Sequence, residues 1–171
     1  MKKFLLSALF LAPLFVAAQE VKKHPQPQPT KDVNIFDVTA NKTTAVVYET
    51  PKELQAKIQK EARLKKWNEA AKKVELAKVP VGGILQVDIA RYNLAAVDAK
   101  LFTILVLDAT GQEKMRTKIN NAVVASTIVA GVSAYKTSGQ LVLDTPLKTG
   151  DSVFVLDEKE NKRYEFLVKN D

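Results

Sequence analysis

The side chains best suited to binding lie in one basic segment, residues 51–78. This segment contains nine Lys or Arg residues and four Glu residues, a net charge of +5, whereas 19–50 and 79–171 each have balanced charges. A surface of this kind attracts lipid headgroups, acidic glycans or an acidic protein face, and a tryptophan beside lysines can insert at such an interface. The candidate anion-binding residues are Lys57, Lys60, Arg63, Lys65, Lys66 and Trp67.

The same segment also has the pattern of a solvated helix face. Three Glu–Lys pairs have the i,i+4 spacing that stabilises a surface helix, namely Glu53–Lys57, Glu61–Lys65 and Glu69–Lys73. In this interpretation the tryptophan packs the helix against the rest of the protein. The regular spacing of the pairs favours the structural role over the anion-binding one.

Carboxylates are the other chemical resource. Six aspartates lie near predicted strand ends or turns: Asp88, Asp98, Asp108, Asp144, Asp151 and Asp157. A calcium site or a catalytic carboxylate pair needs several such groups to converge at one point. The sequence has no Asp-x-Asp pair and no EF-hand loop, and an aspartate in a turn more often caps its own backbone. We expect no metal site and no cofactor.

Covalent and acid–base catalysis lack their usual residues. The chain has no cysteine, and its one histidine, His24, lies in the segment QEVKKHPQPQPTK, residues 19–31. The alternating prolines favour an extended tether, which cannot give a catalytic histidine a fixed orientation. The sequence also has no Gly-x-Ser-x-Gly nucleophile elbow. We therefore expect a protein that is not an enzyme.

Residues 1–18 have the pattern of a bacterial secretory signal peptide. Lys2 and Lys3 precede an apolar run over 4–16, and Val16-Ala17-Ala18 supplies small residues for cleavage after Ala18. The run is shorter than the roughly 18 residues that span a bilayer, so cleavage is favoured over an uncleaved anchor. No later segment is long and apolar enough to span. We expect a periplasmic or secreted protein, with 19–31 as a Pro/Gln-rich tether.

Residues 32–78 predict a β-hairpin followed by a basic helix. Strand-like residues 33–38 and 43–48 flank a turn at 40–42. Thr50, Pro51 and Glu53 have the spacing of an N-cap, a first-turn proline and a capping box. The apolar residues of the helix do not form one stripe. Either the helix breaks near Arg63 or its two halves pack against different surfaces.

Residues 79–171 predict an antiparallel β-sandwich, with 32–171 as one folding unit. Strands are expected at 84–92, 101–107, 113–119, 139–144, 152–156 and 163–169. Residues 122–134, AVVASTIVAGVSA, fit either a buried strand or a short packed helix.

The end of the chain resembles a known fold class. The stretch from Leu147 through Gly150-Asp151 to Val155, with the hairpin to Tyr164-Glu165-Phe166, is similar to the closing strands of immunoglobulin- and fibronectin-like domains. The resemblance covers about the last 90 residues and lacks the cysteine pair of immunoglobulin domains. It implies a mainly β protein, an antiparallel immunoglobulin/fibronectin-like sandwich preceded by one basic α-helix. A fold class does not imply a function.

Together these patterns predict an exported, non-enzymatic binding or structural module. Its partner would be another envelope or extracellular protein, bound through a sandwich face, an edge strand or the helix. The alternative is a peripheral binder of anionic surfaces or polysaccharides through residues 51–78. Nucleic acid is not an expected partner, because the basic segment has one aromatic residue rather than a series of stacking platforms.

Overall fold

The computed structural model describes residues 33–39, 42–120 and 122–170. The predicted signal peptide, the tether and His24 lie outside these residues. The described chain is mainly β, with two α-helices and two short 3-10 helices. The elements in order are β1 (Asn34–Asp37), β2 (Thr44–Glu49), α1 (Pro51–Leu64), α2 (Glu69–Ala77), β3 (Ile84–Arg91), η1 (Leu94–Ala96), η2 (Ala99–Leu101), β4 (Phe102–Leu107), β5 (Glu113–Lys118), β6 (Val123–Val129), β7 (Val132–Val142), β8 (Ser152–Asp157) and β9 (Lys162–Lys169).

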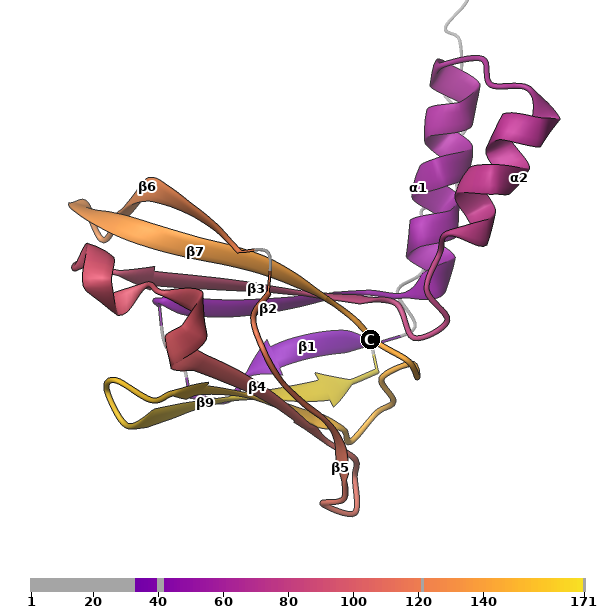
Figure 1. The fold of residues 1–171 in the computed structure, drawn as a ribbon. Coiled ribbons are helices and arrows are strands. Elements are labelled where there is room, and N and C mark those ends of the chain that lie inside the picture. Colours follow the sequence, from indigo (N-terminus) through magenta and orange to yellow (C-terminus); the bar gives the residue numbers. More distant parts are fainter. Residues whose placement is uncertain (1–32, 40–41, 121, 171) are drawn as a thin grey trace, which may run out of the picture.

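The strands form two antiparallel sheets. The first has the order β1-β9-β8-β4-β5, and the second has the order β2-β3-β7-β6. The sheets face each other in a sandwich-like arrangement (Figure 1). Every second side chain of a strand points to the same face, so each sheet can turn one apolar face toward the other. Val87 and Ile89 of the second sheet and Ile104 and Val155 of the first are completely buried in one hydrophobic cluster.

The predicted hairpin of the first two strands is wrong. β1 pairs with β9, whereas β2 pairs with β3, so consecutive strands lie in different sheets. Both strands have the alternating pattern of a half-buried strand, and that pattern carries no information about the pairing partner. Val33, Val46 and Tyr48 join the same core as the later strands.

The predicted single basic helix is two helices, which confirms the alternative of a break near Arg63. α1 ends at Leu64, where Lys66 takes a left-handed conformation with φ 52°. The side chain of Asn68 then caps α2 by accepting the amide hydrogen of Ala71 at 2.8 Å. Neither of the described helices has the length and hydropathy that a membrane crossing requires.

The two helices form an antiparallel hairpin that projects from one end of the sheets (Figure 1). At its start, the Thr50 hydroxyl accepts the amide hydrogen of Glu53 at 3.2 Å, and the Glu53 carboxylate accepts the amide hydrogen of Thr50 at 2.8 Å. This is the predicted capping box. Where the chain returns, the buried Tyr48 hydroxyl donates to the Gly82 carbonyl at 2.9 Å. Burial raises the pKa of Tyr48 above that of an ordinary tyrosine, because the charged phenolate would lose its hydration there. Both ends of the helical hairpin are thereby tied to the end of β2.

Residues 122–134 are strand rather than helix. They form β6, a two-residue turn at Ala130 and Gly131, and the start of β7. Both turn residues have positive φ, 50° and 80°, as the common two-residue β-hairpin turn requires. Most of β6 is exposed, in contrast to the buried strand that its composition suggested.

Candidate interaction surfaces

The structure separates the six predicted anion-binding residues into two groups. Arg63, Lys66 and Trp67 line one shallow pocket of about 220 Å³ at the end of the helical hairpin farthest from the sheets. The Lys65 ammonium lies 5.6 Å from the centre of the Trp67 ring. Lys57 and Lys60 do not line the pocket. Trp67 therefore does not anchor a helix to the sheets, because it lies in the loop that joins α1 to α2, at the end of the helical hairpin away from the sheets (Figure 1).

Four further residues of this pocket were not among the predicted anion-binding residues. Gln59, Ala62, Glu69 and Lys72 also line it, since α2 folds back alongside α1. Their approach depends on the break between the helices, and a single continuous helix would have kept Lys72 far from Gln59.

Only part of the predicted ion-pair pattern forms. Lys65 pairs with Glu61 as expected. Lys57 instead pairs with Glu49 at 2.7 Å, because Glu53 is occupied as the capping residue.

The remaining contacts of the helical hairpin leave a basic surface. Glu69 pairs with Lys72 rather than Lys73, at 3.3 Å, and Lys78 pairs with Glu75 at 2.6 Å. Within the described residues, four basic side chains of the helical hairpin make no ion pair: Lys60, Arg63, Lys66 and Lys73.

Two of the predicted turn aspartates, Asp98 and Asp108, hold the turns in which they lie, whereas Asp88 lies within β3. Asp108 accepts the amide hydrogens of Thr110 at 2.8 Å and Gln112 at 2.9 Å. The hydroxyl of Thr110, and then these amides, lower the pKa of Asp108. Asp98 accepts the amide hydrogen of Lys100 at 3.0 Å.

Two of the aspartates are buried with cationic partners. Asp151 pairs with Lys114 at 2.7 Å, and Asp157 pairs with Arg91 at 2.7 Å. Across the part of the chain that the structure describes, no three acidic, His or Cys side chains meet in a way that could hold a metal ion.

One Ser-x-x-Lys spacing occurs at Ser133 to Lys136 in β7. Serine and lysine three residues apart lie on the same side of a helix, but on opposite faces of a strand. Lys136 lies 3.6 Å from the carboxylate of Asp88 instead. The pair therefore lacks the geometry in which the lysine would activate the serine.

The surface that the sequence analysis missed is the outer edge of β6. β6 pairs with β7 on one side, and no other described strand pairs with its second side. The strand reads VVASTIV, with no charged residue and no proline. Natural proteins usually protect such an edge with charges, proline or a bulge, because its free N–H and C=O groups can pair with another chain.

The other three edge strands each carry a charge. β5, EKMRTK, has four charged residues in six. β1 is four residues long and ends in Asp37, and β2 ends in Glu49. Of the described edge strands, β6 alone has none. The electrostatic repulsion and the desolvation cost that an approaching strand would face are therefore lowest at β6.

Both faces of β6 are accessible as well as its edge. Ser126 lies opposite Tyr135, which lies opposite the buried Arg91, so the even-numbered side chains of β6 share the face that looks toward the other sheet. Yet Val124 is 47% exposed and Ile128 is 73% exposed. The first sheet therefore leaves this end of the second sheet uncovered.

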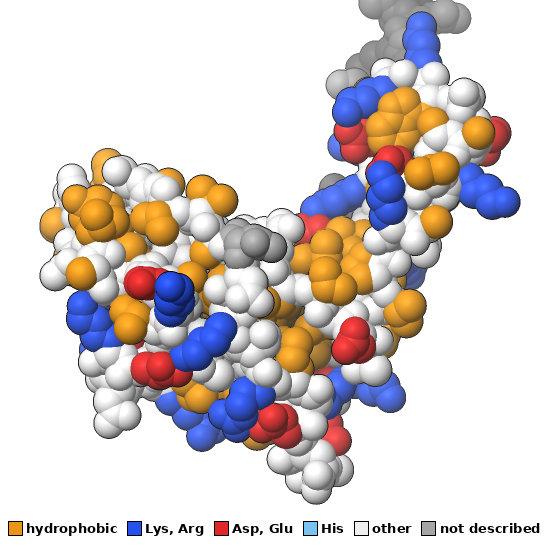
Figure 2. Space-filling model, in the orientation of Figure 1, with side chains coloured by type: hydrophobic (Ala, Val, Ile, Leu, Met, Phe, Trp, Pro, Cys, Tyr) orange, Lys and Arg blue, Asp and Glu red, His pale blue; other side chains and the backbone are white. Residues whose placement is uncertain are grey.

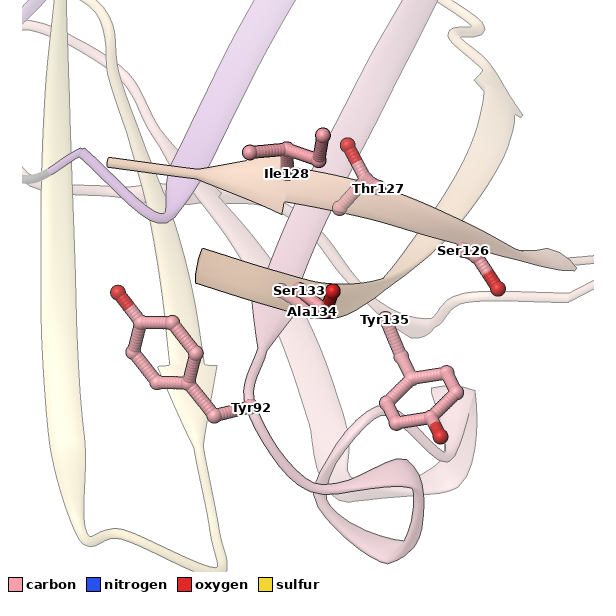
Figure 3. Close-up of a pocket in the computed structure, with 7 residues that line it drawn as sticks. All are labelled: Tyr92, Ser126, Thr127, Ile128, Ser133, Ala134 and Tyr135. Atoms are coloured by element: carbon pink, nitrogen blue, oxygen red, sulfur yellow. The ribbon is translucent and has the colours of Figure 1, made fainter. Parts of the chain in front are cut away.

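Apolar side chains gather around this strand, as the space-filling view shows over the β6–β7 end (Figure 2). The large exposed apolar residues here are Tyr92, Leu94, Val123, Val124, Ile128 and Val132. A shallow pocket of about 410 Å³ lies beside two of them, Tyr92 and Ile128, and is otherwise lined by residues 126–127 and 133–135. Figure 3 shows Ile128 above it and the Tyr92 and Tyr135 rings toward its two sides. Exposed apolar patches beside an unpaired edge are typical of protein-binding surfaces.

The uncharged run over 122–134 was the available signal for this surface. It did not identify an edge, because a central buried strand has the same composition.

Comparison with protein-family models, curated proteins and solved structures finds no match to this chain.

Proposed function

We propose that this chain is an exported, non-enzymatic protein-binding module that takes an extended segment of a partner as an additional strand along β6. The observation that carries the proposal is the seven-residue edge without charge or proline, flanked by exposed apolar side chains. Main-chain hydrogen bonds would supply affinity, and the exposed Val124 and Ile128 would supply side-chain contacts. The signal-peptide pattern of residues 1–18 supports a partner in the bacterial envelope or outside the cell.

The strand order supports an immunoglobulin-like sandwich as the framework. The orders β2-β3-β7-β6 and β9-β8-β4-β5 agree with the A-B-E-D sheet of an immunoglobulin domain and with its G-F-C sheet extended by one strand beyond C. The helical hairpin is then an insertion between the first two strands of the first of these sheets. β1 is an addition, antiparallel to β9.

The binding proposal is tested with residues 19–171, which contain every described residue, as bait for an envelope extract of the native organism. We expect Ile128→Lys to abolish the capture of proteins held through β6, because a lysine on this edge repels an incoming strand and must be desolvated. Val142→Lys is the matched control, since Val142 is 64% exposed on β7, beyond the segment that pairs with β6. If the unmodified chain, Ile128→Lys and Val142→Lys all captured the same proteins, the proposal would be contradicted.

A second candidate function is binding of anionic polysaccharides or lipid headgroups at the end of the helical hairpin. It is favoured by the pocket that brings Arg63 and Lys66 beside Trp67, with no ion pair to either basic side chain among the described residues. Attraction of this kind falls with added salt, because ions screen exposed charges.

Charge reversal tests this second candidate. We expect the double variant Arg63→Glu and Lys66→Glu to leave a heparin column at lower salt than the unmodified chain. The control, Lys100→Glu with Lys148→Glu, changes the net charge equally at exposed sites that do not line this pocket, and should keep the elution position. Equal losses for the two double variants would show that only net charge matters and would reject a site at Trp67.

A further inference from the structure

We infer that the strand bound by β6 is β6 of a second copy of this chain, in an antiparallel pair about a two-fold axis at Ser126. This inference rests on the proposed strand-adding function and names its partner. Two-fold dimers are the commonest symmetric assemblies, and their interface must be complementary to itself. β6 meets that requirement in its charge, its sequence and its place in the fold.

The sequence of β6 is compatible with itself in this register. With Ser126 opposite Ser126, Val123 faces Val129, Val124 faces Ile128, and Ala125 faces Thr127. Large apolar side chains then meet at both ends and small ones at the centre, and such cross-strand apolar pairs stabilise a sheet. No pair places like charges together, whereas β5 paired with itself about Met115 would place Lys114 opposite Arg116.

The fold also keeps the two basic helical hairpins apart. The helical hairpin joins the end of β2 to the start of β3, and Ile84 lies opposite Val142. β6 runs from Val123, nearer that end, to Val129 at the far end. A two-fold axis at Ser126 reverses this direction in the second copy. The two hairpins therefore lie at opposite ends of the combined sheet, where their positive charges repel little because of ionic screening.

The interface predicts a weak, reversible dimer. A seven-residue strand is about 23 Å long. Pairing along it covers the free edge and part of the exposed Val124 and Ile128 side chains, an area at the low end of specific interfaces. We therefore expect dissociation constants on the order of micromolar, so that the chain is monomeric when dilute and dimeric when concentrated.

A single introduced cysteine tests the pairing, because the chain has none of its own. Residues opposite each other in an antiparallel pair have Cα atoms about 4.5–5.5 Å apart, within disulfide range. We expect Ser126→Cys in residues 19–171 to form a disulfide-linked dimer under mild oxidation. Val123→Cys is the control on the same strand, since the proposed register places its two copies roughly 20 Å apart. Equal cross-linking of both variants, or of neither, would overturn the inference.

Sedimentation of the unoxidised chain gives an independent measurement. The unmodified chain and Val142→Lys should approach twice the monomer mass as concentration rises, whereas Ile128→Lys should stay monomeric, with a dissociation constant raised at least tenfold. A chain that is monomeric throughout, or a dimer that Ile128→Lys leaves intact, would overturn the inference. If a foreign envelope protein is nevertheless captured in an Ile128-dependent way, the proposed strand-adding function stands without the second copy. If that capture fails too, both are rejected.

Discussion

Replacing Asp157 by asparagine should lower the free energy of unfolding by about 3 kcal/mol, because it leaves the buried positive charge of Arg91 without its ion-pair partner. Asp157 and Arg91 belong to different sheets, and their side chains are 1% and 6% exposed. One oxygen of Asp157 accepts from the Arg91 guanidinium at 2.7 Å. The other accepts the amide hydrogens of Lys159 at 3.1 Å and Glu160 at 3.0 Å. The asparagine keeps the size of the side chain but removes its charge.

The surroundings of Arg91 explain why the loss is not fully compensated. The guanidinium also donates to the Ala90 carbonyl at 2.8 Å and to the Tyr164 hydroxyl at 3.2 Å, but both partners are neutral. The nearest remaining carboxylate, that of Glu160, lies 3.6 Å away and is partly exposed. Urea unfolding at pH 7 measures the change. The control, Glu113→Gln, removes the exposed Glu113–Arg116 pair and should lower the free energy of unfolding far less, because solvent screens a surface ion pair.

The position of this ion pair links its loss to the β6 edge. Arg91 lies opposite Tyr135, and Tyr135 lies opposite Ser126. The pair therefore joins the two sheets level with the middle of β6. If Asp157→Asn and Glu113→Gln proved equally stable, the Asp157–Arg91 pair would contribute no more than a surface ion pair. That result would contradict its role in joining the two sheets.

Gly82→Ala should destabilise the protein by about 3 kcal/mol, the upper range for adding a methyl group to a filled site. A Cβ atom at Gly82 would lie 2.2 Å from the Leu143 carbonyl oxygen and 2.6 Å from the Thr145 nitrogen. Both are backbone atoms, so neither can rotate away. The amide of Gly82 also donates to that Leu143 oxygen at 3.0 Å, and its carbonyl accepts from Tyr48. Relief of the clash therefore disturbs hydrogen bonds that tie the helical hairpin to the sheets.

Gly111→Ala separates steric contact from backbone conformation. Gly111 has φ +87°, which costs an alanine about 1–2 kcal/mol, but nothing lies within 4 Å of its added Cβ. Gly82 has the close contacts without a positive φ. Urea unfolding should therefore show the larger loss for Gly82→Ala. The opposite order would mean that the chain around Leu143 moves easily and that the helical hairpin is loosely attached.

Local structure could be predicted from the sequence where short-range physics decides it. The capping box at Thr50 and Glu53 depends on residues three apart, and the strands near the end of the chain follow from alternating side chains and turn residues. The break between the helices was available as one of two alternatives. Asn68, a good N-cap residue just after Arg63 and Lys66, was the residue that decides between them.

Pairing between strands could not be predicted in the same way. The segments around Ile35 and Val46 read as two halves of a hairpin, but they join different sheets. Whether Val123–Val129 lies at the centre or the edge of a sheet depends on the strand order, which local composition does not specify. The surface proposed here for binding was missed for that reason. The basic segment was visible from its charge, although only Arg63, Lys66 and Trp67 meet in one pocket.

Amide hydrogen exchange of β6 tests the central claim most directly. The measurement compares residues 123–129 in the dilute chain and in its isolated complex, whether with a second copy or with a captured envelope protein. Amides bonded to β7 should be protected in both states. Those pointing to the free edge, every second residue, should become protected only in the complex. Edge amides of β6 that exchange equally fast in the two states, with new protection elsewhere, would contradict strand addition at β6.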